Sequence, residues 1–418
     1  MKYLHVFNSE TDYNTVRESN YKEPWVSATN MGVGDSTPSY RVNYNKSEYE
    51  KLLETPLTFE ITSAGRIVWK ANSSAYTVTL EYSKDNGQNW AQITSNTGSS
   101  APSISVEAGD MIQFRCGNDN GYDTMSSGGS YYNSFTGTTA GFKVKGNIMS
   151  LLSKNNFASI DTLQSVYTFC YLFQKCTGLT DASKLVLPAT TLAEDCYYFM
   201  FNGCTSLTTA PELPATTLAA YCYSNMFNGC TGLTTAPELP ATTLANYCYY
   251  NMFQNCTNLT TAPSILPATT LVRGCCAYMF YNCRNLTTAP ELPATTLAQQ
   301  CYNNMFERCT SLTTAPELLA TTLAQDCYQS MFSNCTSLIT APELPATTLA
   351  QGCYSSMFYN CVSLNYIKAM FTTTPSDSYT YDWVKGVAST GTFVKNSAAT
   401  WDVSGSNGVP TGWTVQTV

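Results

Sequence analysis

The sequence predicts a mixed β and α/β protein, with an N-terminal β-sandwich followed by a solenoid of short parallel strands and short helices and a C-terminal cap. Three observations support this. Residues 55–148 hold segments in which apolar and polar residues alternate between Gly, Asn and Ser. Residues 149–365 repeat a unit of about 26 residues. Residues 366–418 contain three of the six tryptophans, which suits the closed end of a repeat array.

Residues 1–54 form the first predicted unit, a linker that attaches the protein to a particle or to an anchor protein. Only its end, Ser47 to Glu54, has a short helical pattern. At the start of the chain, the apolar stretch ends at Asn8. That is too early for a signal-peptide core of about 7–15 apolar residues. We therefore expect synthesis without a recognisable signal peptide.

Residues 55–148 contain three clear strand patterns, at 57–61, 66–69 and 76–82, which predict the sandwich. The segment 83–90, Ser-Lys-Asp-Asn-Gly-Gln-Asn-Trp, resembles the Asp-box of sialidase-like propellers. In that resemblance the Asp and the Trp fix a hairpin turn. A sialidase would need several copies and an arginine cluster, but this region has only Arg66 and Arg115. A turn is the better interpretation than glycoside hydrolysis.

The repeat region, 149–365, is marked by Met-Phe pairs. They begin at Met200, Met226, Met252, Met279, Met305, Met331 and Met357, in steps of 26 residues with one step of 27. An earlier Leu172-Phe173 brings the total to about eight repeats. Such a period with regular leucines falls in the leucine-rich-repeat range.

Each repeat is predicted to contain a strand and a helix. In the representative unit the strand is 207–210, and Pro211 ends it because proline has no N–H to donate. With about 100° per residue, the nearly invariant positions around Cys222 fall on one half of a helix, which we expect to be buried. The positions two, three and six after the first cysteine of each repeat vary and fall on the other half, which we expect to face water.

This pattern resembles the BspA-like leucine-rich repeats of bacterial surface proteins, in which a Met-Phe-x-x-Cys-x-x-Leu segment follows a short strand led by leucine. The resemblance covers about half of the chain. It departs at Thr-Thr-Ala-Pro-Glu-Leu-Pro, where that family usually has Leu-x-x-Leu-x-Leu. The whole layout also resembles repeat proteins of gut Bacteroidetes and their phages. This second resemblance implies display on a particle or a cell surface.

Seven repeats carry cysteine pairs eight residues apart, such as Cys222 and Cys230. If the segment between the two cysteines is helical, it rises about 12 Å over eight residues, beyond the roughly 7 Å Cα limit of a disulfide, and pairing within a repeat is then excluded. We interpret most of the 18 cysteines as buried free thiols. Disulfides between repeats and a metal site are the alternatives. Cys276 occupies a tyrosine position, and we expect it to be more accessible.

The composition excludes several classes of function. Charged residues make up 12% and the net charge is -8, which is the wrong sign for binding nucleic acid. His5 is the only histidine, so imidazole catalysis and histidine metal sites have almost nothing to build on. No apolar run reaches the length of a transmembrane helix. We expect no enzyme, no catalytic residues, no cofactor, no metal and no membrane insertion.

The outward helix positions are rich in Tyr, Asn, Ser and Gln, residues that antibody paratopes also favour. The candidate binding residues are Tyr198, Asn225, Tyr250, Tyr278 and Asn304. The alternative is an ordinary helix surface. A second column holds Glu212, Glu238, Glu291, Glu317 and Glu343. We interpret it as solvated charge at a turn, with a bound cation as the alternative.

Together these patterns predict a non-enzymatic adhesion or receptor-binding protein. The solenoid would present its surface to a cell-surface glycan or protein, and the protein would lie on a virion or an extracellular surface. The alternative is a purely structural decoration or spacer protein without a specific ligand. Association into a homo-oligomer is left open.

Overall fold

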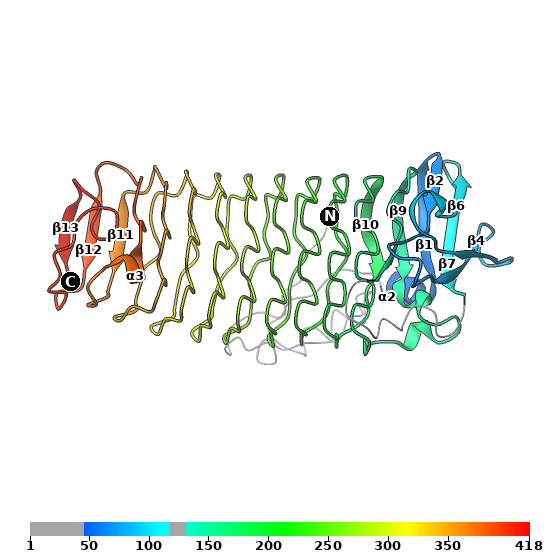
Figure 1. The fold of residues 1–418 in the computed structure, drawn as a ribbon, viewed down its shortest axis with the longest axis horizontal. Coiled ribbons are helices and arrows are strands. Elements are labelled where there is room, and N and C mark those ends of the chain that lie inside the picture. Colours follow the sequence, from blue (N-terminus) through cyan, green and yellow to red (C-terminus); the bar gives the residue numbers. More distant parts are fainter. Residues whose placement is uncertain (1–45, 118–130) are drawn as a thin grey trace.

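A computed structural model describes residues 46–117 and 131–418. It is elongated, with strands at one end, a stack of similar coils in the middle and a small sheet at the other end (Figure 1). The segment predicted to attach the protein, 1–54, lies outside the described residues except for its last part. That part forms helix α2, Lys46–Glu54, as the sequence predicts.

The N-terminal sheet region follows α2. Its strands are β1 (Leu57–Ser63), β2 (Gly65–Val68), β3 (Lys70–Ala71), β4 (Thr79–Ser83), β5 (Ala91–Thr94), β6 (Ser103–Val106), β7 (Met111–Cys116), β8 (Asn133–Ser134) and β9 (Gly141–Asn147). Short 3₁₀ helices lie at Gly98–Ser100, Ile148–Leu151 and Phe157–Ser159. The main sheet has the order β10-β9-β1-β7-β4-β5, and β2-β6 and β3-β8 form two smaller sheets. The predicted strands are confirmed, while the sandwich arrangement stays a prediction.

Phe59 in β1 shows why these strands form a sheet. Along β1 the apolar residues Leu57, Phe59 and Ile61 alternate with polar ones and are buried. The Phe59 ring lies 5.0 Å from Phe114 and 4.6 Å from Phe142, on the two strands that pair with β1. Aromatic contacts across neighbouring strands therefore fix the pairing of this region.

The sheet continues directly into the coils. Strand β10 (Leu179–Val186) pairs in parallel with β9, and Asp181 within β10 forms a parallel bridge with Thr209 of the next coil. Phe173, in the first coil, lies 6.0 Å from Phe59. A single hydrophobic core therefore runs from the sheet region into the repeats.

The predicted repeat helix is wrong. In the Cys-to-Cys segment, which we define as the nine residues 222–230 and their equivalents, the amides alternate between two kinds of partner. Ser224 and Met226 donate to carbonyls three residues earlier, at 3.0 and 3.2 Å, whereas Tyr223 and Asn225 donate to the next coil, at 3.0 and 2.8 Å. An α-helix needs bonds to the fourth residue back. The segment is instead a run of turns that is hydrogen-bonded to its neighbours.

This backbone requires left-handed residues at regular places. Asn225 (φ 57°), Gly229 (φ 75°) and their equivalents have positive φ values. Gly and Asn tolerate this conformation better than other residues. At the position of Gly229, six of the seven complete repeats carry Gly or Asn, and Arg308 is the exception: Gly203, Gly229, Asn255, Asn282, Arg308, Asn334 and Asn360. The amides and glycines of this segment thus have a backbone role.

The predicted strand at 207–210 is reduced to single parallel bridges. In successive coils these bridges involve Thr209, Thr235, Thr261, Thr288, Thr314 and Thr340. Pro211 and its equivalents follow two residues later and cannot donate to a longer ladder. Only the first and last coils of the stack carry real strands here, β10 and β11 (Tyr366–Ala369).

The coil interior is built from ladders of identical side chains. Phe201, Phe227 and Phe253 stack with ring centroids 5.4 and 5.6 Å apart, and the ladder continues from Phe173 to Phe358. A parallel tyrosine ladder includes Tyr249 and Tyr302 but is interrupted between them by Cys276. Cys276 is 1% exposed, so the prediction that it is accessible is wrong. Its position in the repeat points inward whichever residue occupies it.

The C-terminal end closes the ladders with tryptophans. Helix α3 (Asp377–Thr380) and the strands β12 (Thr392–Lys395) and β13 (Thr414–Thr417) follow β11, and the three strands form a parallel sheet. Trp383 lies 6.1 Å from Phe358, the last ring of the phenylalanine ladder. Trp383, Trp401 and Trp413 are buried and donate their indole N–H to backbone carbonyls. Together they cover the apolar end of the stack.

Candidate functional site

The 18 cysteines are candidate reactive groups, but their geometry gives them a structural role. All 18 are unpaired and buried. The second cysteine of each pair donates its thiol to a carbonyl of the preceding coil, as Cys256 does to Phe227 at 3.1 Å. Burial raises the pKa of Cys204 and Cys256 to about 12. These thiols therefore join neighbouring coils and are poor nucleophiles.

Thiol titration tests this assignment. We expect almost no reaction with a thiol reagent in the native protein, because the sulfurs are shielded and protonated, and at least 14 of the 18 thiols to react in denaturant without reductant. A count near zero in denaturant would show that the columns are cross-linked between coils.

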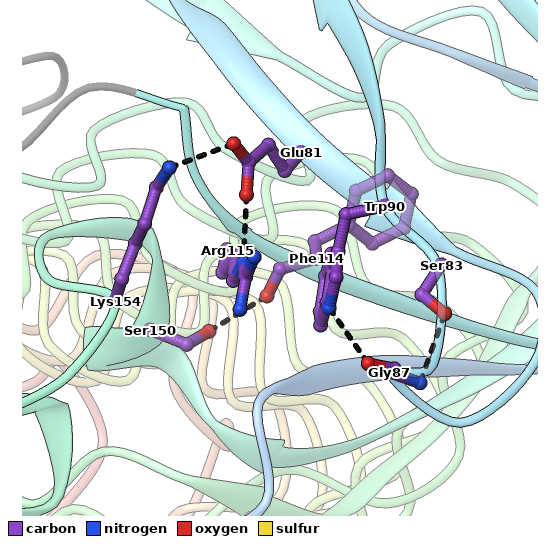
Figure 2. Close-up of polar contacts among 8 residues, drawn as sticks. All are labelled: Glu81, Ser83, Gly87, Trp90, Phe114, Arg115, Ser150 and Lys154. Atoms are coloured by element: carbon purple, nitrogen blue, oxygen red, sulfur yellow. Dashed lines mark hydrogen bonds and ion pairs between the residues drawn. The ribbon is translucent and has the colours of Figure 1, made fainter.

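A charged cluster connects strands β4 and β7 of the sheet region to Lys154, which follows the 3₁₀ helix Ile148–Leu151 (Figure 2). Glu81 accepts from Arg115 at 2.8 Å and from Lys154 at 2.7 Å, and the Arg115 guanidinium lies 3.8 Å from the centre of the Trp90 ring. Burial acts to raise the pKa of Glu81, but the bonds to Lys154 and Arg115 outweigh it and lower that pKa. The Glu81 carboxylate is paired with two side chains of the protein, so we interpret this cluster as a structural contact and not as a binding site.

The predicted Asp-box turn is confirmed. Asp85 accepts from the Ser83 hydroxyl and from the Asn89 amide, at 2.7 and 2.8 Å, and Trp90 donates to the Gly87 carbonyl at 3.0 Å. The bonds from Asn89 are the main reason that the pKa of Asp85 falls to about 2. The residues close the hairpin between β4 and β5.

The structure separates the five candidate binding residues into amides and tyrosines. Asn225 is 5% exposed, so its placement on an exposed face is wrong. Its side chain donates to Ser224 and accepts from Asn228, both at 3.0 Å. Asn304 also has positive φ, and its side-chain amide donates to Glu307. Both amides serve the backbone turn and internal bonds, which explains their presence without a ligand.

The tyrosines, in contrast, touch one another on the outside of the coils. Tyr221 stacks on Tyr247 at 5.1 Å, and Tyr250 contacts Tyr247 at 5.8 Å and Tyr278 at 5.7 Å. Tyr278 in turn lies 5.9 Å from Tyr281. These side chains are half-buried, so each leaves part of its ring exposed. We call the whole set the tyrosine surface: Tyr171, Tyr198, Tyr221, Tyr247, Tyr250, Tyr278 and Tyr281.

The tyrosine surface covers only the first coils. Tyr171 and Tyr198 begin it, with ring centroids 5.7 Å apart. In later coils the positions of Tyr198 and Tyr278 carry Gln329, Ser330, Ser355 and Ser356, and only the position of Tyr281 has a tyrosine again, at Tyr359. The backbone therefore does not require tyrosine at these positions. Sequence reasoning named Tyr198, Tyr250 and Tyr278. It missed Tyr221 and Tyr247, which lie one residue before the first cysteine, and it did not single out Tyr281 in the outward column six after Cys275.

A carboxyl group lies at the N-terminal end of this surface. Asp195 is 9% exposed, and its burial raises its pKa to about 6. A hydrogen bond from Tyr167 acts in the opposite direction and lowers this pKa, but its effect is smaller. The neighbouring Glu194 adds a smaller increase. Tyr171, Tyr198 and Tyr221 also lie close enough to interact with this carboxyl. Asp195 is thus a carboxyl that titrates near neutral pH among aromatic rings.

The glutamate column behaves as charge at a turn. Glu238 accepts from the Ser264 amide at 3.1 Å, and Glu343 pairs with Lys368 at 2.9 Å. Within residues 46–117 and 131–418, no three His, Cys, Asp or Glu side chains gather as metal ligands. In the same ranges no helix is long and apolar enough to cross a membrane.

The comparisons with known proteins agree with the repeat assignment. No curated protein and no solved structure matches the chain. The family model of the BspA type leucine rich repeat region matches in six copies, over residues 149–264 and 269–386. The two matched ranges separate next to Ile265, in the repeat that is one residue longer than the others. With more than half of its residues matched, the chain belongs to the BspA type leucine-rich-repeat family.

Proposed function

We propose that this protein is a non-enzymatic adhesion or receptor-binding protein whose tyrosine surface contacts a cell-surface glycan or protein. A leucine-rich-repeat scaffold suggests an interaction surface and is typically not catalytic. The observation that carries the proposal is the chain of touching, half-exposed tyrosines at positions where later coils of the same stack carry serine. Tyrosine supplies rigid contact area at low entropic cost.

The proposed location is a virion or an extracellular surface, with attachment through the N-terminal segment 1–54. The resemblance to repeat proteins that are displayed on surfaces supports this.

The alternative function is a structural spacer without a specific ligand. The uninterrupted phenylalanine ladder favours it, since that ladder stiffens the stack whether or not a ligand binds. The spacer account does not explain why large exposed rings gather on the first coils.

Serine substitutions test the proposal. In the full chain, the triple change Tyr198→Ser, Tyr250→Ser and Tyr278→Ser copies residues that later coils carry at these positions. Binding to a panel of bacterial and animal cells should weaken by more than about 1 kcal/mol, or about fivefold or more in Kd, because the aromatic contact area is lost. The melting curve should be nearly unchanged.

The matched control is Gln329→Ser with Tyr359→Ser, two changes on the outside of later coils. This variant should bind as the native chain does. Equal binding by the native chain and the triple variant would favour the spacer function. The full chain is needed in each assay, because Phe173 packs against the rings of the sheet region and the repeats share its core.

A further inference from the structure

Arginines lie over two rings of the longest run of touching tyrosines. The run is Tyr221, Tyr247, Tyr250, Tyr278 and Tyr281. The Arg273 guanidinium lies over the Tyr247 ring at 5.9 Å from its centre, and the Arg308 guanidinium lies over Tyr281 at 5.7 Å. Arginine is weakly hydrated and stacks on aromatic faces, so both guanidinium groups stay at the surface beside the rings.

The distribution of charge along the repeats is uneven in the same place. Residues 177–364 hold four basic residues, and three of them lie within 273–308: Arg273, Arg284 and Arg308. The rest of this range has Lys184 against eight acidic residues. The one strong concentration of positive charge in an acidic array therefore coincides with the tyrosine run.

The two arginines differ in their partners. Arg308 lies 3.8 Å from Glu307, whose pKa is raised by burial. Arg273 is exposed and makes no ion pair within residues 46–117 and 131–418. An unpaired guanidinium beside a flat aromatic surface is suited to form charge-assisted hydrogen bonds with an anion.

The position of the Tyr247 ring depends on Gly274. A Cβ atom added to Gly274 would lie 2.3 Å from Cε1 of Tyr247, so the ring rests directly on the glycine backbone. Most other repeats have a side chain at this position, such as Tyr221 or Gln300. The coil that carries Arg273 therefore also leaves space for the ring beneath it.

We infer that the tyrosine surface binds a sugar that carries a carboxylate or a sulfate. The rings of Tyr247, Tyr250 and Tyr278 would pack against the apolar C–H face of the sugar, and Arg273 would bind its anionic group. The inference rests on the proposed function and deepens it, since it names the chemical class of the receptor. A protein of net charge -8 has no general attraction for anions, so such a preference has to come from this local cluster.

The test compares lactose, sialyllactose and sulfated lactose as probes for the full chain, by calorimetry. At least one of the two anionic sugars should bind about tenfold or more tighter than lactose, in line with a charge-assisted hydrogen bond. The variant Arg273→Gln should lose this preference and keep its affinity for lactose. Arg273→Lys should retain only part of the preference, because a lysine cannot bind in a bidentate way.

Arg284→Gln is the matched control. It makes the same change in net charge, but Arg284 donates to Asn282 at 2.9 Å and lies on no tyrosine ring that the described residues show. An equal loss in both variants, or equal binding of the three sugars, would overturn the inference. If cells bind in a tyrosine-dependent manner and none of the sugars binds, the inference fails while the proposed function stands.

Discussion

Replacing Phe253 with alanine should lower the free energy of unfolding by about 3–5 kcal/mol. Phe253 is fully buried and stacks between Phe227 at 5.6 Å and Phe280 at 5.5 Å. The Phe253 carbonyl also accepts a hydrogen bond from the Cys283 thiol at 3.1 Å. The substitution leaves a cavity, and if the backbone moves to fill it, this hydrogen bond between coils is disturbed. Denaturant melts of the full chain measure this loss.

The neighbouring Tyr250→Ala is the control, with an expected cost below about 1 kcal/mol because this ring is half-buried on the outside of the coil. Equal and small losses in the two variants would contradict the assignment of inner and outer faces.

Asp195 should make the stability of the protein depend on pH. Its pKa is about 6 in the folded protein and about 3.9 in an unfolded chain, so the folded state binds more protons between these values. The contribution of Asp195 to stability should be largest below about pH 4, fall as the pH rises through 6, and then level off. At pH 7, Asp195→Asn should be more stable than the native chain by about 1–3 kcal/mol.

Urea melts at pH 4 and at pH 7 measure this effect. The native chain should lose more stability than the Asn variant between the two values. Asp326→Asn is the matched control, because it changes the same residue type at the same repeat position in a later coil. The same pH dependence in the native chain and in Asp195→Asn would contradict the role of this carboxyl.

The buried columns could be predicted from the sequence, but the helix could not be distinguished from the turns. Inward residues occur at positions 0, 1, 4, 5 and 8 of the Cys-to-Cys segment, as at Cys222, Tyr223, Met226, Phe227 and Cys230. Over eight residues a period of four and the helical period of 3.6 give nearly the same half-face. The distinguishing signal is Asn at the position of Asn225 (φ 57°), because a left-handed residue in the middle of the segment does not fit an α-helix, whereas Gly or Asn at the position of Gly229 also suits the end of a helix.

The misassignment of Asn225 has the same cause. On a helix its position faces water, whereas in the run of turns it has a φ of 57° and its side chain is buried in a hydrogen-bond network. Asparagine is common in such conformations because its side chain can bond locally.

The tyrosine surface was predicted in part. Tyr198, Tyr250 and Tyr278 could be found by comparing equivalent positions along the repeats. Tyr247 lies one residue before Cys248, outside the columns that the sequence analysis compared, and Tyr281 lies in the outward column six after Cys275 but was not singled out. The run of turns within each coil places them beside Tyr250 and Tyr278. The position of Arg273 over Tyr247 likewise depends on contacts between neighbouring coils, which the period alone does not define.

The most direct test of the account is oxidative footprinting of the tyrosines in the full chain, with and without membranes of the cells that it binds. The account predicts that Tyr198, Tyr250 and Tyr278 become protected, while the exposed Tyr381 near the C-terminus is oxidised equally in both states. Protection of Tyr381 alone, or of tyrosines in residues 46–117 alone, would contradict the claim that the tyrosine surface contacts the receptor.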